Sequence, residues 1–171
     1  MFERLLLALD DSPASEVATA FAAAVATGCS ASVHVFHVNE LQVGGRGVSL
    51  KSTEECLDFV TEAVLELRAH GVTVGGSAVC GTYREVANRI ADAAVVQKAD
   101  AIILGSQRRP SRLGGLFSPN VRERTIRLSA LPVLTAPSPL HVSVQSALRI
   151  DDVLGAYATA DLTTLPTAGL I

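Results

Sequence analysis

The chain has 171 residues, of which 49% are hydrophobic and 18% charged, and its formal net charge is -3 at pH 7. That length favours one domain with a sizeable core, and the negative charge argues against a protein that binds nucleic acid through an excess of positive charge. Because the sequence has neither a signal-peptide pattern nor an apolar run near the ~20 residues of a membrane span, we expect a cytoplasmic protein.

Strands and helices are predicted to alternate from the start of the chain. Residues 4–9, R-L-L-L-A-L, form an apolar run typical of a strand buried on both faces. The Ser-Pro pair that follows is typical of an N-cap and first helical residue, so a helix covers 13–27 and ends at Gly28. A second strand is predicted over 31–38, and the glycine-rich residues 39–50 are expected to form a loop.

The middle of the chain continues the pattern. A second helix is predicted after Ser52 or Thr53, either of which can be its N-cap, and it ends at His70-Gly71. Its apolar stripe consists of Leu57, Val60, Val64 and Leu67. A third strand is predicted over 72–79, and Thr82 is expected to cap a third helix. The residues that share one face of that helix are Val86, Ile90, Ala94 and Gln97.

The stretch from 98 to 137 contains the last strands. Ala101–Leu104 is a short apolar run that Gly105 stops, which predicts a buried strand. Residues 106–119 have no helical or strand periodicity, a helix begins at about Asn120, and a final strand covers 132–136. Five strands joined by helix-length crossovers require an α/β fold, a mostly parallel sheet with helices on both faces.

In these motifs the chain resembles the universal stress protein family over residues 2 to about 137. The resemblance rests on the start L-L-A-L-D-D-S-P-A-S, on Gly105-Ser106, on the helix V-R-E-R-T-I-R and on the last strand L-P-V-L. The family's loop motif is G-x2-G-x9-G-[ST]. In this chain Arg108 replaces the second glycine, Pro119 the third and Asn120 the Ser/Thr, so the motif is degenerate.

The resemblance implies a flavodoxin-like, Rossmann-like sheet with strand order 3-2-1-4-5 over residues 1–137. Strands 1 and 4 then border one crevice at their carboxyl ends, where open α/β sheets bind ligands. Residues 138–171 lie beyond the family domain. We expect a C-terminal tail with one short helix there, with a disordered tail as the alternative.

The family resemblance further implies an adenine nucleotide, ATP or AMP, in that crevice. Asp10 is expected to bond to a ribose hydroxyl or base edge, although turn or capping chemistry is the alternative. The backbone of Val38 matches an adenine contact, while Gly105 and the start of the following helix meet the phosphates. The predicted nucleotide site comprises Ala8, Asp10, Val38, Gly105, Ser106, Arg108, Asn120 and Val121.

The loop of residues 106–119 departs most from the family pattern. Pro119 removes one backbone donor, and Arg108 cannot adopt positive φ as cheaply as glycine. Arg108, Arg109 and Arg112 could replace the lost donors by bidentate bonds to phosphate. The alternatives are a solvated basic loop and one that pairs with acidic groups of another chain.

Nothing in the sequence identifies an enzyme. It has no G-x-S-x-G, no H-E-x-x-H and no complete P-loop. His34 and His37 are three residues apart in a strand, so they point to opposite faces and cannot share a metal. We expect no metal except Mg accompanying ATP. Cys29, Cys56 and Cys80 suit neither a disulfide framework nor a zinc site, and we interpret them as buried hydrophobic residues.

Three functions therefore stay open. The first is a regulatory, stress-response protein that binds adenine nucleotide, and the second is a nucleotide-free interaction module with an unknown regulatory protein partner. Slow ATP hydrolysis is a weaker third. The family resemblance also implies a homodimer through the last strand, and the apolar L-P-V-L-T-A edge agrees with that expectation.

Overall fold

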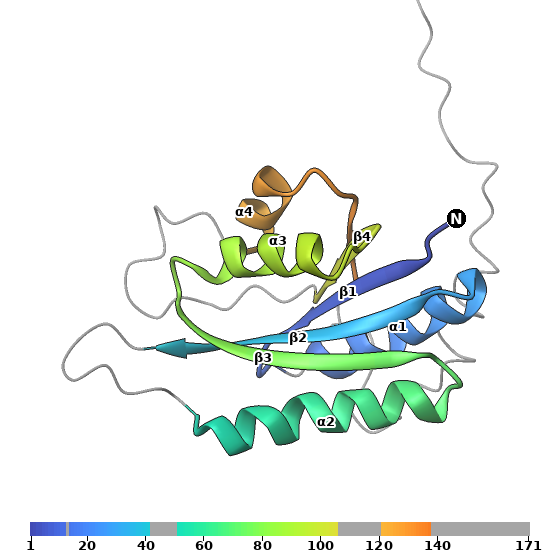
Figure 1. The fold of residues 1–171 in the computed structure, drawn as a ribbon, viewed down its shortest axis with the longest axis horizontal. Coiled ribbons are helices and arrows are strands. Elements are labelled where there is room, and N and C mark those ends of the chain that lie inside the picture. Colours follow the sequence, from blue (N-terminus) through green and yellow to red (C-terminus); the bar gives the residue numbers. More distant parts are fainter. Residues whose placement is uncertain (13, 42–50, 106–120, 138–171) are drawn as a thin grey trace, which may run out of the picture.

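A computed structural model of the chain describes residues 1–12, 14–41, 51–105 and 121–137 (Figure 1). These residues form a five-stranded parallel sheet with the strand order β3-β2-β1-β4-β5, which confirms the predicted fold. The elements in chain order are β1 (Arg4–Leu9), α1 (Ala14–Cys29), β2 (Ser32–Leu41), α2 (Thr53–Ala69), β3 (Val74–Thr82), α3 (Val86–Val96), β4 (Ala101–Leu104), α4 (Val121–Leu128) and β5 (Val133–Thr135).

The sheet separates two hydrophobic cores, because alternate residues of a strand face opposite sides. On one side Leu5, Leu7 and Leu9 pack against α1 and α2. On the other side Leu6 and Ala8 pack in the cluster that contains α3. Figure 1 shows α2 below the sheet and α3 and α4 above it. β1 and β4 lie between the two layers, and for this reason their apolar runs are nearly continuous.

Two predicted helix boundaries are wrong. α1 continues through Gly28 to Cys29, and Ser30 takes the left-handed conformation with φ 57°. Thr82 is the last residue of β3 instead of a helix cap, and α3 begins at Val86 after Glu85. The Glu85 carboxylate nevertheless fixes this turn, because it accepts bonds from the backbone N–H (2.8 Å) and the hydroxyl (3.0 Å) of Thr82. These bonds hold the pKa of Glu85 below its ordinary value.

The structure of α2 decides between Ser52 and Thr53, the two N-cap residues that the sequence allowed. Ser52 is its N-cap and forms a capping box with Glu55, and the helix ends as predicted at His70, followed by Gly71 with φ 76°. Its buried stripe differs by one residue, because Leu57 is 51% exposed while Cys56 is 2% exposed. The residues of α2 that are buried are Cys56, Val60, Ala63, Val64 and Leu67.

β2 and β3 are shifted or longer than predicted. β2 was predicted to end at residue 38, but the strand continues to Leu41. β3 was predicted over 72–79, but it covers 74–82. The added residues pair with each other, Glu40 with Gly81 and Leu41 with Thr82. Residues 39–41 and 80–82 have no strand pattern of their own, because each segment is stabilised as a strand by pairing with the other.

The cysteine interpretation is correct for Cys56, which is buried, and wrong for Cys80, which is exposed on β3. Four predictions fall on residues that the structure does not describe: Pro13 as the first helical residue, the loop within 42–50, the segment 106–120 and the tail 138–171.

Candidate functional site

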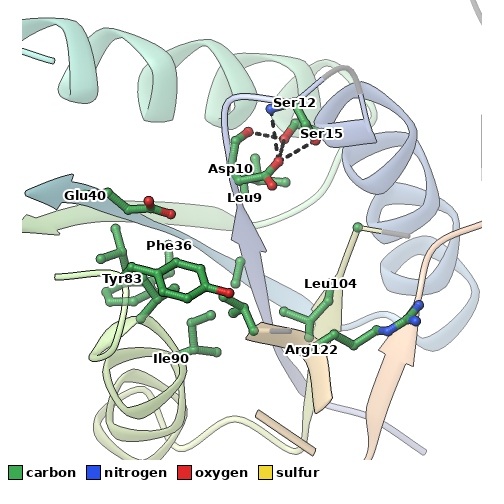
Figure 2. Close-up of a pocket in the computed structure, with 15 residues that line it drawn as sticks. Leu9, Asp10, Ser12, Ser15, Phe36, Glu40, Tyr83, Ile90, Leu104 and Arg122 are labelled. Atoms are coloured by element: carbon green, nitrogen blue, oxygen red, sulfur yellow. Dashed lines mark hydrogen bonds between the residues drawn. The ribbon is translucent and has the colours of Figure 1, made fainter. Parts of the chain in front are cut away.

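A pocket opens at the carboxyl ends of β1, β2 and β4, on the sheet face that α3 covers (Figure 2). Its cavity volume is about 140 Å³, roughly ten times the 10–15 Å³ that one ordered water requires. The position is the topological switch point of the sheet, where β1 has β2 on one side and β4 on the other. The pocket is lined by Ala8, Leu9, Asp10, Ser12, Ser15, Phe36, Val38, Glu40, Tyr83, Val86, Ile90, Leu104, Gly105, Val121 and Arg122.

The floor of the pocket is apolar. Phe36 and Val38 of β2 and Leu104 of β4 reach it because they occupy the alternate positions that face α3. Val86 and Ile90 of α3 meet them from the other side, one turn apart on the same helix face. All five side chains are at most 8% exposed, so the floor is pre-formed and suits a flat apolar group.

Asp10 stands at the rim, directly after β1, in a hydrogen-bonded turn. Its Oδ1 accepts bonds from the backbone N–H of Ser12 (3.0 Å) and from the Ser12 hydroxyl (2.5 Å). The Ser15 hydroxyl donates to the backbone oxygen of Asp10 and lies 3.4 Å from Oδ1. Figure 2 shows these bonds converging on the turn. Oδ2 takes part in none of these bonds. Asp10 is exposed, so the turn fixes the orientation of its carboxylate through Oδ1 while Oδ2 faces away from these bonds.

Charged and aromatic side chains complete the rim. Figure 2 shows Glu40 and Tyr83 on one side of the pocket and Arg122 on the opposite side, with Asp10 between them. Glu40 and Arg122 are half-buried, and Tyr83 is 42% exposed. The pocket therefore has an acidic, aromatic end and a basic end, which matches a ligand that is polar at both ends and apolar in the middle.

A separate set of contacts supports the rim from the other face of the sheet. The Lys51 ammonium forms an ion pair with Asp11 at 2.7 Å and lies 5.0 Å from the centre of the Phe59 ring. Phe59 packs edge-on against the buried His37, whose Nδ1 lies 3.0 Å from the backbone oxygen of Leu9. These contacts join the end of β1 to α2.

Five of the eight predicted site residues line this pocket together: Ala8, Asp10, Val38, Gly105 and Val121. Gly105 sits against α1, because a Cβ added to it would lie 3.5 Å from the Cβ of Ala14. The other three, Ser106, Arg108 and Asn120, lie outside the described residues.

The sequence did not identify Glu40, Tyr83 and Arg122 as site residues. Glu40 was assigned to a loop, and only its pairing with Gly81 extends β2 far enough to bring it to the pocket. Period-two alternation from Phe36 through Val38 is the signal that could have found it.

Among the described residues, no group of three or more His, Cys, Asp or Glu side chains comes together that could hold a metal ion. His34 and His37 face opposite sides as predicted, since His34 bonds to Ser77 while His37 packs on Phe59. Among the described residues, no helix has the length and apolar content needed to cross a membrane.

Fold and pocket together define a parallel α/β protein with a ligand pocket at the switch point of its sheet. A family model described as the universal stress protein family matches residues 1–137. The chain therefore belongs to the universal stress protein family. A search among curated proteins found no match.

Solved structures of the family share this fold. The universal stress protein from Archaeoglobus fulgidus in complex with dAMP is 24% identical with a TM-score of 0.60, covering 79% of this chain and 98% of that one. A universal stress protein in complex with cAMP is 18% identical with a TM-score of 0.63, covering 79% and 96%. A family member from Burkholderia pseudomallei is 22% identical with a TM-score of 0.59, covering 80% and 96%.

Proposed function

We propose that this chain is a regulatory protein of the stress-response type that binds an adenine nucleotide, ATP or AMP, in the pocket between β1 and β4. The observation that supports the proposal is the pocket itself, which combines an apolar floor with the Asp10 carboxylate at its rim. Two structures with the same fold carry dAMP and cAMP.

The parts of a nucleotide match the parts of the pocket. A purine ring suits the apolar floor between Phe36, Val38 and Ile90. A ribose hydroxyl can donate to Asp10, whose orientation the Ser12 bonds fix before any ligand arrives. Phosphates suit the basic end, where Arg122 and the N-terminal turn of α4 are both electropositive.

The loop of residues 106–119 is expected to complete the phosphate site. In our proposal Ser106 and Asn120 donate to phosphate oxygens beside Gly105 and Val121, and Arg108 replaces the donors that the degenerate motif has lost. Any Mg would accompany ATP. The chain's own residues supply no identified general base, so we propose binding and not hydrolysis as the function, with slow ATP hydrolysis as a minor alternative.

The proposal is tested with the full chain. The purified protein is denatured, and any released nucleotide is identified by absorbance and chromatography. Titration calorimetry with ATP, ADP, AMP and cyclic AMP then measures affinity. Folded protein that carries no nucleotide and gives no heat with any of the four would exclude nucleotide binding and leave an interaction module of the same fold.

Variants at two positions, Asp10 and Arg108, test how the site binds nucleotide. Asp10→Ala should weaken binding roughly tenfold to a hundredfold, because it removes a charge-assisted hydrogen bond of about 1.5–3 kcal/mol. Asp10→Asn keeps an acceptor for Ser12 and separates this loss from damage to the turn. Asp58→Ala, an exposed carboxylate on α2, is the matched control and should change nothing. Arg108→Ala should cost more than Asp10→Ala only if the arginine carries the phosphate contacts.

A further inference from the structure

We propose that Glu40 and Tyr83 form a base-selecting end of the pocket, which prefers a planar base carrying an exocyclic amino group. This inference rests on the proposed nucleotide function and names a selectivity within it. Neither residue belongs to a sequence motif. The pairing of β2 with β3 brings both of them to the pocket.

The position of Glu40 follows from strand geometry. In β2 the residues Phe36, Val38 and Glu40 alternate onto the face toward α3, so the carboxylate continues the apolar floor by one step. The pairing of Glu40 with Gly81 holds this end of β2 in place. Figure 2 shows the carboxylate directed into the pocket and not outward. A carboxylate at the end of an apolar slot can accept a hydrogen bond from a donor group of a ligand.

Tyr83 stands beside it on a braced turn. The preceding residue, Thr82, donates two bonds to Glu85, and the backbone N–H of Glu85 donates to the oxygen of Thr82 at 2.8 Å. Tyr83 is thereby held at the pocket rim, although its ring is 42% exposed. An aromatic ring presented at the rim is suited to stack on a flat base.

The charges around the pocket determine whether the base or the phosphate lies at the end formed by Glu40 and Tyr83. Asp10 and Glu40 are both acidic, whereas Arg122 lies on the opposite side of the pocket (Figure 2). A phosphate group would be repelled by Glu40 and attracted by Arg122, so the base takes the end with Glu40 and Tyr83. With the base there, a carboxylate accepts a bond from an amino group but has no donor to offer to a carbonyl.

The test compares AMP with purine riboside 5′-monophosphate, which lacks only the 6-amino group. Calorimetry on the full chain should give AMP an affinity higher by about tenfold to a hundredfold, the range of one bond to a charged acceptor. Glu40→Leu removes the acceptor at similar volume and should bring the ratio of the two affinities close to one. Glu40→Gln keeps a neutral acceptor and should give an intermediate ratio, and it serves if the leucine variant does not fold.

Matched controls separate selectivity from general damage. Glu62→Gln changes an exposed carboxylate on α2, across the sheet, and should leave the ratio as in the wild type. Tyr83→Ala should weaken both nucleotides alike, roughly tenfold, while Tyr83→Phe should retain both affinities. Equal wild-type affinity for AMP and the analogue would overturn the role of Glu40 while nucleotide binding stands. Binding of neither compound would overturn the proposed function and this inference together.

Discussion

Gly76 shows how one position in an edge strand sets the packing of a helix. A Cβ at Gly76 would clash with Cγ1 of Val60 and come within 3.0 Å of Cγ2 of Val64, both on α2. Valine side chains are stiff at χ1 and cannot turn aside cheaply. The lack of a side chain at Gly76 therefore makes room for α2 against β3.

We predict opposite effects of alanine at the two neighbouring glycines. Gly76→Ala should lower the free energy of unfolding by about 1–3 kcal/mol, because it overpacks the contact of β3 with α2. Gly75→Ala faces the other side, where its nearest atom is Nδ1 of His34 at 3.8 Å, and it should gain about 0.5 kcal/mol from reduced chain entropy. Urea unfolding measures both. A Gly76→Ala protein as stable as the wild type would show that α2 shifts freely on β3.

At the scale of elements, the sequence predicts what is local and misses what depends on a partner. The predicted position of β1 agrees with the structure, because an unbroken apolar run bounded by polar residues is recognisable without tertiary context. The ends of β2 and β3 were not, since residues 39–41 and 80–82 form strands only by pairing with each other. The misplaced end of β2 also explains why Glu40 was not predicted as a site residue, because Glu40 lies in residues 39–41.

The helix boundaries follow the same rule. The capping box of α2 is local chemistry, and the sequence narrowed its N-cap to two residues. α1 passed through Gly28 because its last turn packs Cys29 against the core, a contact between distant residues that no glycine preference reveals. Tertiary packing overrode the local signal.

The capping box gives a prediction at this scale. The Ser52 hydroxyl accepts from the backbone N–H of Glu55 at 3.1 Å, and the Glu55 carboxylate accepts from the backbone N–H of Ser52 at 2.6 Å. Ser52→Ala should cost about 1 kcal/mol of stability. Thr53→Ala, beside it, leaves both bonds in place and is the control. Urea unfolding at neutral pH distinguishes the two variants.

The same box should lose strength in acid. Its hydrogen bonds hold the pKa of Glu55 below the ordinary value of 4.5. A carboxyl group whose folded pKa is depressed adds stability that is fully present above the ordinary pKa and is lost as pH falls through the folded pKa. The difference in stability between wild type and Glu55→Gln should therefore shrink as pH falls below 4.5. A difference that stays constant down to pH 3 would contradict this role for the carboxylate.

At the scale of the whole molecule, the sheet has two unlike edges. β3 forms one edge and the three-residue β5 the other. Val133 and Leu134 of β5 are only half-buried, and in α4, the helix that precedes β5 in the chain, Ile126 and Leu128 are each 51% exposed. A short apolar edge strand favours association, and so do exposed apolar helix residues.

We predict a homodimer through the β5 edge, measurable by light scattering at micromolar concentration as twice the mass of the chain. Ile126→Glu with Leu128→Glu should shift the protein toward monomer, because both changes place charge on an apolar surface at the expected interface. Leu57→Glu with Leu65→Glu is the matched control, since these residues of α2 are 51% and 57% exposed and lie on the opposite side of the sheet. The control should stay dimeric. A wild-type monomer at this concentration, or dissociation by the α2 pair alone, would move the interface away from β5.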